Sequence, residues 1–354
     1  MFAFFHQNDV TDAQGGIERY VDTLLAAAGE EAVLVSEEPA RPARNRLGLR
    51  LPRMPGPKWI PFAVAVAAAA RRIRAALAAG PKKPVLEFSR PEYVVFAPLF
   101  PGVRIFTIHG TGPGKGERAK RLVHDLACWF LPRVADRVQV VGRDDTGLSP
   151  GVIARLGTRL AHVDAWYADV FTPRPLPAGD KTIVFYAGRI VEQKNPKLLF
   201  EIIREGKRRF GDTIEFRYFG KDVDRIEAVG LAADVVCSGL LDAPRLAAAI
   251  GECHIGLMCS HFGEGSPFII VETLACGRPY VLSPLPTLLG AYAGNPGVRF
   301  AADFTAESFL AEIVRLRADL DAGLDAETIA ASVAARAEPV ATRALLAELA
   351  TLAD

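Results

Sequence analysis

The sequence predicts an α/β protein of two Rossmann-like, doubly wound domains that face each other across a cleft. A chain of 354 residues is long for a single core and suits two α/β domains. Apolar segments of strand length alternate with segments of helix length along both halves, which favours parallel sheets. Residues 169–181 are rich in proline and lack apolar periodicity, so we place the domain boundary there. The predicted domains span residues 1–168 and 169–335, followed by a C-terminal helix at 336–354.

The composition predicts where in the cell the protein works. Half of the residues are hydrophobic, and the formal charge of +1 identifies no partner by itself. The five cysteines are scattered without a Cys-x-x-Cys pair, which predicts reduced thiols in a cytoplasmic protein without a zinc site. The N-terminus lacks the basic start of a signal peptide, and the longest apolar run, 59–70, is too short to span a bilayer. We therefore expect a cytoplasmic protein, either soluble or peripheral on the inner face of the cytoplasmic membrane.

The first half begins with an apolar strand at 2–5 and a glycine turn at Gly15 and Gly16. A helix is predicted from Ile17 onward, because apolar residues recur there at helical spacing. A strand, a glycine turn and a helix let a backbone approach a phosphate, although a simple tight turn explains the pattern too. The other predicted strands are residues 32–35, 85–88, 103–108, 137–141 and 160–163. The other predicted helices are residues 63–79 and 144–156.

A basic segment interrupts this alternation. Residues 39–86 contain eleven Lys or Arg residues and no Asp or Glu. The first six cations are interspersed with Leu, Trp and Phe, a mixture that suits contact with anionic lipid headgroups. A solvated basic loop explains the same pattern, and nucleic acid is disfavoured because no nucleic-acid-binding motif accompanies it. The residues predicted to contact the membrane are Arg41, Arg44, Arg46, Arg50, Arg53, Lys58 and Trp59.

A glycine-dense loop follows the strand at 103–108 and starts with His109 and Gly110. Ligands of open α/β sheets bind at such carboxyl ends of strands. The glycine spacing fits neither the Walker A motif nor the dinucleotide-binding pattern. A histidine at this place is a candidate functional residue.

The second half repeats the alternation of strands and helices. Its predicted strands are residues 182–186, 215–219, 234–237, 255–258 and 280–283. Its predicted helices are residues 196–209, 222–230, 243–251 and 267–276, with a helical tail from 306. Arg189 and Lys194 follow the first of these strands, where two cations would neutralise a diphosphate.

Two glutamates, Glu264 and Glu272, flank a Gly-Ser-Pro turn and an apolar run. We predict that Ser266 caps a helix whose first residue is Pro267. Backbone N–H groups at a helix start attract phosphate, and carboxylates accept hydrogen bonds from sugar hydroxyls. An ordinary capped helix with two incidental glutamates explains this stretch as well.

Four segments together point to one enzyme family. They are Gly-Gly-Ile-Glu-Arg at 15–19, His-Gly at 109–110, Gly-Arg-Ile…Lys-Asn-Pro at 188–196, and Glu-Gly-Ser-Pro…Glu-Thr-Leu-Ala-Cys-Gly-Arg-Pro at 264–279. In this order they resemble the retaining glycosyltransferases of the GT-B fold, family 4. The resemblance covers nearly the whole chain and is strongest in the second half. It implies an acceptor-side first domain, a second domain that binds a nucleotide sugar, and a final helix that packs back on the first domain.

The resemblance implies catalytic roles for His109, Arg189, Lys194 and Glu264. His109 would lie near the transferred sugar and Glu264 would hydrogen-bond it. Arg189 and Lys194 would stabilise the departing nucleoside diphosphate, while Glu272 would bind the ribose hydroxyls. The other substrate-binding positions that it implies are Gly15, Gly16, Gly188, Gly265, Ser266, Pro267, Phe268 and Ile269.

The leading prediction is a retaining, metal-independent hexosyltransferase that needs no cofactor. It would move mannose from GDP-mannose, or glucose or galactose from a UDP-sugar, to a lipid-linked or polysaccharide acceptor in bacterial cell-surface glycan synthesis. The expected partners are the nucleotide sugar, the acceptor and an anionic membrane surface, with no nucleic acid. The alternatives are a GT-B nucleotide-sugar epimerase and a non-catalytic scaffold that binds a nucleotide sugar.

Overall fold

The chain divides into two compact units in the computed structural model, which describes residues 1–10, 15–38, 45–78, 82–110, 118–143 and 147–353. Unit 1 comprises Met1–Val163 together with Pro339–Asp354, and unit 2 comprises Asp164–Glu338. The C-terminal segment therefore groups with unit 1. The sequence-based boundaries, 168/169 and 335/336, lie a few residues from those of the two units.

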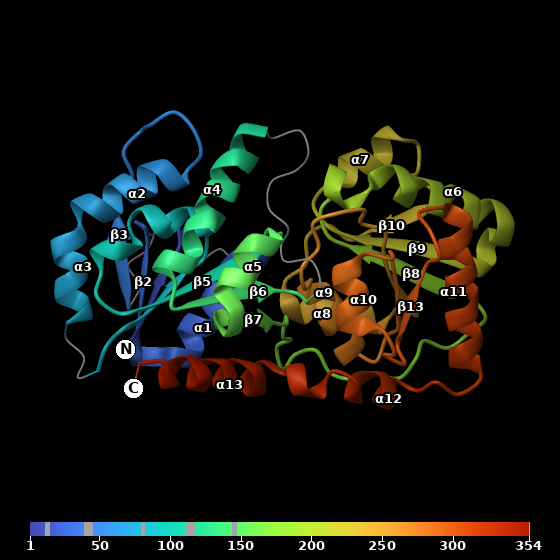
Figure 1. The fold of residues 1–354 in the computed structure, drawn as a ribbon. Helices are drawn as coiled ribbons and strands as arrows, with labels where there is room; N and C mark the ends of the chain where they lie inside the picture. The colour runs from blue at the N-terminus through green and yellow to red at the C-terminus, as the bar shows by residue number, and fades with distance from the viewer. Residues whose placement is uncertain (11–14, 39–44, 79–81, 111–117, 144–146, 354) are drawn as a thin grey trace. The chain divides into compact units, whose positions relative to one another are not determined.

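Unit 1 contains a seven-stranded parallel sheet in the order β3-β2-β1-β4-β5-β6-β7. Its strands are β1 (Phe2–Phe5), β2 (Ala32–Glu37), β3 (Arg46–Leu49), β4 (Val85–Phe88), β5 (Val103–His109), β6 (Arg137–Val141) and β7 (Leu160–Val163). The chain adds β2 and β3 on one side of β1 and the later strands on the other, so the strand order reverses between β1 and β4. Right-handed crossovers in opposite directions place helices on both faces of such a sheet (Figure 1).

The core of unit 1 is aromatic. The Phe88 ring stacks on Phe5 at 4.8 Å and on Phe106 at 4.9 Å between centroids, joining three adjacent strands. The helices around this core are α1 (Gly16–Ala28), α2 (Trp59–Ala68), α3 (Ala70–Leu77), α4 (Arg118–Val134), α5 (Pro150–Leu156) and α13 (Glu338–Thr351).

Unit 2 contains a six-stranded parallel sheet in the order β10-β9-β8-β11-β12-β13. Its strands are β8 (Thr182–Ala187), β9 (Ile214–Phe219), β10 (Val235–Cys237), β11 (Ile255–Met258), β12 (Tyr280–Leu282) and β13 (Val298–Phe300). Its helices are α6 (Pro196–Phe210), α7 (Val223–Ala228), α8 (Ala243–Gly251), α9 (Phe268–Ala275), α10 (Pro286–Tyr292), α11 (Ala306–Asp321) and α12 (Ala326–Ala331). Here the strand order reverses between β8 and β11.

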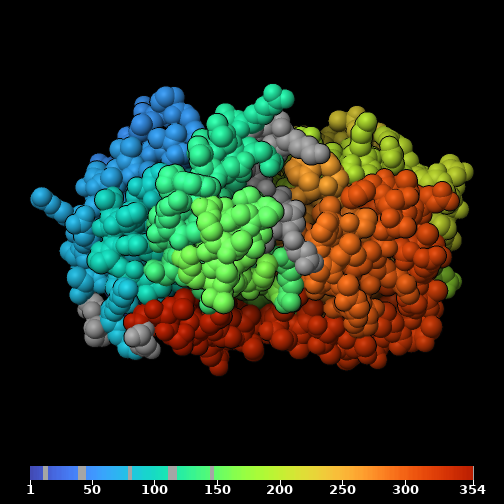
Figure 2. Space-filling model, in the orientation of Figure 1, coloured from blue at the N-terminus to red at the C-terminus, as the bar shows by residue number. Residues whose placement is uncertain are grey.

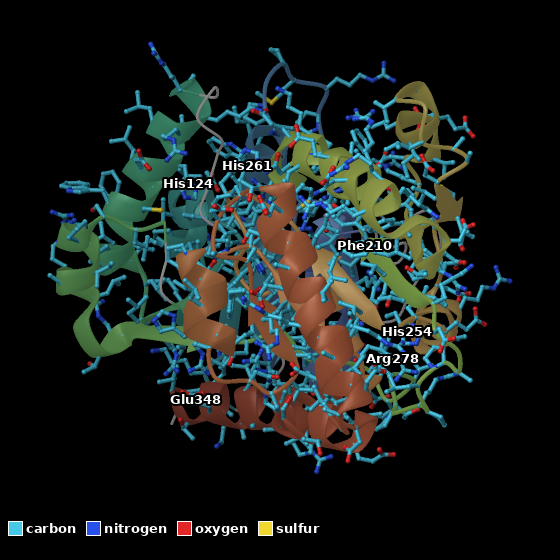
Figure 3. The ribbon with its side chains drawn as sticks, turned by 90° about the vertical axis from the view of Figure 1, so that its right-hand side faces the viewer. His124, Phe210, His254, His261, Arg278 and Glu348 are labelled. Carbon is cyan, nitrogen blue, oxygen red and sulfur yellow. The ribbon has the colours of Figure 1, made fainter. Side chains whose placement is uncertain are left out.

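The Pro-rich segment at 169–181 is tied to unit 2 by two buried basic side chains. Arg278, which is fully buried, donates to the carbonyl oxygens of Arg174 at 2.8 Å and Pro175 at 2.6 Å. His254 accepts from the backbone N–H of Ile183 at 3.1 Å, so its other nitrogen donates to the Pro177 oxygen at 3.2 Å. Figure 3 shows Arg278 and His254 at the same end of this unit. A segment that looked like a loose linker in sequence is thus held by hydrogen bonds.

The α/β fold class and the parallel sheets are confirmed, but four elements were not predicted and one differs. The strands β3 and β13 were missed because both are short and only partly buried, and the helices α4 and α10 were missed altogether. The predicted helix 63–79 is two helices, since Ala69 leaves the helical backbone region with ψ near 4°. All five cysteines are free thiols, as predicted. No described helix has the length and apolar composition needed to cross a bilayer.

Candidate functional site

The two most closely paired candidate residues meet where the strand order of unit 2 reverses. The loop after β8 carries Lys194 and the loop after β11 carries Glu264. Lys194 Nζ donates to Glu264 Oε1 at 2.6 Å across this reversal point, although the residues are 70 positions apart. In open α/β sheets the ligand crevice forms outside the carboxyl ends of the strands at such a point. The fold therefore assembles two of the four predicted catalytic residues where a ligand is expected.

The site contains two predicted cations, but one of them is neutralised by Glu264. The Lys194 and Glu264 side chains are 16% and 6% exposed and neutralise each other. Arg189, in the same loop as Lys194, is exposed, and its guanidinium pairs with no acid among the described residues. The net positive charge available to an anionic ligand here is thus that of Arg189.

Residues that the sequence did not single out hold Glu264 in place. Gln193 Nε2 donates to the Gly263 carbonyl at 3.0 Å and lies 3.4 Å from Glu264 Oε1. Thr287 Oγ1, from α10, donates to the Glu264 carbonyl at 2.6 Å. Gln193 is adjacent to Lys194 in a polar loop, which is a weak signal. Thr287 carries no local signal, because only the tertiary fold brings it here.

The loop at Gly188 is fixed by side chains from β9 and from the loop that follows β9. Tyr218, in β9, donates to the Gly188 carbonyl at 2.9 Å, and Asp222 Oδ2 accepts from the Ile190 N–H at 2.8 Å. Gly188 has φ of +143°, a backbone conformation that other residues rarely adopt. A Cβ atom at Gly220 would lie 2.4 Å from the Gly188 oxygen. These partners lie in β9 or directly after it, next to β8 in the sheet, and their place at a strand end was the only indication of them in the sequence.

The start of α9 corrects one prediction. The helix begins at Phe268, and Pro267 occupies the cap position with an extended backbone. Ser266 Oγ accepts a hydrogen bond from the Ala165 N–H at 2.8 Å and does not cap α9. The Ser266 side chain is therefore used to hold the start of unit 2. Ile269 then occupies the second position of α9, within the N-terminal end of this short helix.

Several polar side chains near Glu264 have little solvent exposure. Glu272 lies within α9 and is 2% exposed. Burial, followed by the charge of Glu264, raises the pKa of Tyr280, and burial also raises the pKa of Tyr186. Both hydroxyls are consequently neutral around physiological pH. Gly265, in the loop before α9, is partly exposed.

Unit 1 has a polar cluster at its own reversal point, between β1 and β4. His6 Nδ1 lies 2.7 Å from Ser89 Oγ, and its Nε2 lies 3.4 Å from Glu18 Oε1. Ser89 also donates to the Phe5 carbonyl at 3.0 Å, which leaves its oxygen free to accept from His6. The His6 hydrogen bond, with help from Asn8, lowers the pKa of Glu18 to about 2. Neither His6 nor Ser89 was a candidate from the sequence, although each directly follows a predicted strand.

His109 ends β5 beside this cluster. Its ring packs edge-to-face on Tyr20 with centroids 5.0 Å apart. Its Nε2 is buried and forms no hydrogen bond within the described part of the chain. Burial, followed by the charges of His6 and Arg90, lowers the pKa of His109 to about 3. The ring is therefore neutral near pH 7 and can either accept or donate one hydrogen bond at each nitrogen according to its tautomer.

The glycine turn accommodates a carboxylate. Gly15 occupies the cap position of α1 and Gly16 its first residue. A Cβ atom at Gly15 would lie 2.3 Å from Glu18 Oε2, so glycine is needed for the Glu18 side chain to fold back on the helix start. The structure thus gives Gly15 a local role that the sequence did not suggest.

Three cations of the basic segment, Arg46, Arg50 and Lys58, are paired with acids from elsewhere in unit 1. Arg46 lies in β3 with a side chain that is 9% exposed, and it pairs with Asp9 at 2.9 Å and with Asp22 at 3.4 Å. Its predicted exposure to a membrane is therefore wrong. The sequence count missed these acids because they are remote along the chain.

Three further members of the predicted membrane contact are constrained in similar ways. Arg50 pairs with Glu38 at 3.0 Å and Lys58 with Glu37 at 2.5 Å. Trp59 is partly buried and packs against the unit 1 core. Arg53 is exposed. Arg41 and Arg44 lie outside the described residues.

A metal site is not evident among the described residues, where no three His, Cys, Asp or Glu side chains are grouped to hold an ion. The residues suited to hold an anionic ligand in unit 2 are Arg189, Lys194 and the N-terminal end of α9.

Sequence comparison finds a family that matches part of unit 2. The family described as "Glycosyl transferases group 1" matches residues 181–319. These residues contain Arg189, Lys194, Glu264 and Glu272. Curated proteins give no sequence match.

Solved structures resemble the chain over nearly its whole length. Sucrose-phosphate synthase from Thermosynechococcus elongatus aligns with a TM-score of 0.77 at 16% identity, covering 99% of this chain and 98% of that one. Anabaena HepE in complex with UDP and glucose aligns with a TM-score of 0.74 at 14% identity, covering 99% of both chains. The lipopolysaccharide outer core galactosyltransferase WaaB aligns with a TM-score of 0.69 at 13% identity, again covering 99% of both chains. The fold is therefore that of GT-B glycosyltransferase structures.

Proposed function

We propose that the chain is a glycosyltransferase that moves a hexose from a nucleotide sugar to a saccharide or lipid-linked acceptor. The observation that carries the proposal is the Lys194–Glu264 contact of 2.6 Å at the reversal point of the unit 2 sheet. A cation and a carboxylate side by side, next to the exposed Arg189, match a donor that carries a diphosphate and a hydroxyl-rich sugar. The matched family and the GT-B fold support the same activity.

The proposed chemistry uses electrostatic stabilisation of the leaving group. The bond between the sugar C1 and the diphosphate oxygen breaks, and a bond forms between C1 and the acceptor oxygen. The acceptor's proton passes to the departing diphosphate. Arg189 and Lys194 would stabilise the charge that develops on that leaving group, and Glu264 would accept a hydrogen bond from the sugar. We propose retention of the anomeric configuration, with no metal or other cofactor.

The remaining candidate residues are proposed to help bind the substrates. Gly188, Gly265 and the first turn of α9 would let the donor approach the backbone. Glu272 would bind the ribose hydroxyls, and His109 would contribute a neutral hydrogen-bonding ring near the acceptor side. Gly16 would let a substrate approach the backbone at the start of α1.

The donor is proposed to be a UDP-hexose before GDP-mannose. Support comes from the structural resemblance to Anabaena HepE, which was solved with UDP and with UDP-glucose. The structural resemblance to WaaB, a lipopolysaccharide galactosyltransferase, supports an acceptor in bacterial cell-surface glycan synthesis.

A thermal-stability screen of nucleotide sugars tests the proposal without knowledge of the acceptor. A ligand at one hundred times its Kd stabilises the folded protein by about 2.7 kcal/mol, which corresponds to an increase in Tm of roughly 5 °C or more. We expect one donor among UDP-glucose, UDP-galactose and GDP-mannose to raise Tm, and Lys194→Met to reduce the shift by about half or more. If none of the donors stabilises the wild-type protein, the proposal fails.

Incubating that donor without acceptor separates the two alternative activities. A transferase leaves the donor sugar unchanged apart from slow hydrolysis, whereas an epimerase converts it to a second nucleotide sugar. A scaffold binds the donor but shows no transfer in any acceptor mixture. Conversion of the sugar without acceptor would overturn the transferase proposal in favour of an epimerase.

A further inference from the structure

The helix α4 exposes an apolar stripe on the surface of unit 1. Five large side chains of this helix, on its outer face, are each at least 40% exposed. They are Leu122 (62%), Val123 (40%), Leu126 (52%), Trp129 (44%) and Phe130 (43%). We call these residues the α4 stripe. Figure 2 shows α4 and α5, coloured teal to green, on the face turned to the viewer.

The α4 stripe is a second apolar face, separate from the one that packs on the core. The core-facing residues His124, Ala127, Cys128 and Leu131 are buried and recur at helical spacing. The stripe recurs at 122, 126 and 129–130, on the other side of the helix. The outer face of a surface helix is normally polar. The outer face of α4 is unusual, because its apolar side chains are exposed.

The exposed apolar area is large for the free surface of a protein. An aromatic side chain carries about 150–250 Å², so Trp129 and Phe130 alone expose on the order of 130–220 Å² at their measured fractions of 44% and 43%. The three aliphatic residues bring the stripe to the few hundred Å² at which an exposed apolar patch usually marks an interaction site. Ile153, from the adjacent α5, is 36% exposed and adds to the apolar character of this region.

The charges around the stripe have one dominant sign. Arg118, Lys120 and Arg121 lie at the start of α4, Arg133 lies at its end, and Arg155 comes from α5. Asp125 is the single acid within α4. Arg118, Arg133 and Arg155 form no ion pair with an acid in the described ranges of the chain. The surface thus combines a stripe of Leu, Trp and Phe with a net positive rim.

The cations stand next to the aromatic part of the stripe. The Arg133 guanidinium lies 4.2 Å from the centre of the Trp129 ring, and that of Arg155 lies 5.4 Å from it. Trp is the side chain most suited to the boundary between lipid headgroups and acyl chains, because its ring is apolar and its N–H is polar. Arg side chains beside it are placed to meet phosphate groups.

From this surface we propose that α4 docks unit 1 on an anionic lipid membrane. Leu122, Leu126 and Phe130 enter the boundary between headgroups and acyl chains, and Arg118, Arg133 and Arg155 contact lipid phosphates. An interfacial helix has this composition, with Trp, Phe and Leu on one face and Lys and Arg beside them. The proposal does not depend on the proposed transferase activity. It also moves the membrane contact away from residues 45–62, whose described cations are mostly paired.

Co-sedimentation with vesicles tests the proposal on the full chain. We expect the wild-type protein to bind vesicles of phosphatidylglycerol and phosphatidylcholine, to bind pure phosphatidylcholine at least tenfold more weakly, and to lose affinity as salt rises. Leu122→Gln with Leu126→Gln is expected to weaken binding at least tenfold, because both side chains leave water on docking. Arg133→Ala is expected to weaken it about fivefold.

Matched controls separate the stripe from general effects of exposed residues. Leu240 and Leu289, in unit 2, are 66% and 38% exposed, so Leu240→Gln with Leu289→Gln removes a similar exposed area elsewhere. Arg50→Ala removes an exposed cation that is paired with Glu38. Neither control is expected to change vesicle binding by more than twofold. Unchanged Tm values show that each variant is folded.

Tryptophan fluorescence gives a second readout. The chain has three tryptophans, and Trp129 is the exposed one, whereas Trp166 is buried and Trp59 partly buried. Docking is expected to shift the emission to shorter wavelength, and Trp129→Phe is expected to keep binding but lose the shift.

Three outcomes would overturn the proposal. The first is no binding of the wild-type protein to the anionic vesicles. The second is binding that the Leu122/Leu126 double variant leaves unchanged. The third is concentration-dependent dimerisation that this double variant abolishes without any vesicle binding, which would assign the stripe to a contact between two copies of the chain.

Discussion

Glu264 and Lys194 set the charge of the unit 2 site as a pair. Their contact of 2.6 Å leaves Arg189 as the cation with unbalanced charge in this loop. A bound diphosphate would therefore compete with Glu264 for Lys194. This competition gives the two members of the pair opposite effects on the affinity for a nucleoside diphosphate.

Glu264→Gln should separate nucleotide binding from transfer. Removing the negative charge frees Lys194 for a phosphate, so we expect equal or tighter binding of the nucleoside diphosphate. Transfer should fall at least a hundredfold, because the carboxylate no longer holds the sugar. Calorimetric titration with the diphosphate and an initial-rate assay measure the two effects.

Lys194→Met is the matched variant at the other end of the same contact. It should weaken diphosphate binding at least tenfold, the loss expected for one charged hydrogen bond of about 1.5–3 kcal/mol. Equal losses of diphosphate affinity in both variants would show that the pair acts only in holding the loop.

Glu87 makes the stability of unit 1 depend on pH. It lies in β4, 1% exposed, and burial raises its pKa from 4.5 to about 8. The folded chain keeps the proton that the unfolded chain loses near pH 4.5. The contribution of Glu87 to stability is therefore full below pH 4.5 and is lost as pH rises towards 8.

Glu87→Gln should remove this dependence. Relative to wild type, the variant should gain up to about 4 kcal/mol in the free energy of unfolding between pH 4.5 and pH 8, and no more above pH 8. Urea unfolding at a series of pH values measures the difference. A difference that stays constant across this range would contradict the buried, protonated state of Glu87.

At the scale of elements, buried strands were the most predictable part of the fold. The strands at 85–88, 137–141 and 255–258 have the predicted bounds, because each is mainly apolar and is buried in its sheet over all or nearly all of its length. The helix α4 was missed although 124, 127, 128 and 131 show helical spacing, since its outer face is apolar too and blurs the pattern.

The part of the candidate site that was predictable consists of residues with a local sequence signal, such as a place directly after a strand. Arg189 and Lys194 were found because they follow an apolar strand, and Glu264 because it precedes a Gly-Ser-Pro turn and an apolar run. Thr287 could not be found, because it reaches Glu264 from α10, the third element after the Glu264 loop. Arg46 was misplaced on the surface for the same reason, since Asp9 and Asp22 neutralise it only in the folded state.

The turn between α9 and β12 provides a test of packing between elements. Gly277 has φ of +72°, and a Cβ atom there would lie 2.4 Å from the Cβ of Ala326 in α12. Gly294 has φ of +80° but no atom within 4 Å of the same position. Gly277→Ala should therefore cost the backbone strain of about 1–2 kcal/mol plus an overpacking cost of about 1–3 kcal/mol.

Gly294→Ala should cost only the strain. Comparing the urea unfolding of the two variants isolates the packing contribution of α12 against this turn. If both variants lose the same free energy of unfolding, then α12 moves aside without a cost and the close contact adds no destabilisation.

At the scale of the whole molecule, both units follow one plan. Each sheet is parallel and reverses its strand order beside its first strand, between β1 and β4 in unit 1 and between β8 and β11 in unit 2. A polar contact bridges each reversal point: His6 with Ser89 at 2.7 Å, and Lys194 with Glu264 at 2.6 Å. The topology accounts for both sites, because residues after the two strands on either side of a reversal meet at one sheet edge.

The central claim is that the reversal point of unit 2 binds the diphosphate of a nucleotide sugar. Titration calorimetry with UDP, or with GDP if the stability screen selects a GDP-sugar, tests it most directly by comparing wild type, Arg189→Ala and Arg208→Ala. Arg208 is an exposed cation near the far end of α6, paired with Glu205. The account predicts that Arg189→Ala raises Kd at least tenfold while Arg208→Ala leaves it within twofold of wild type. Equal affinities of all three proteins, or no binding by the wild type, would contradict it.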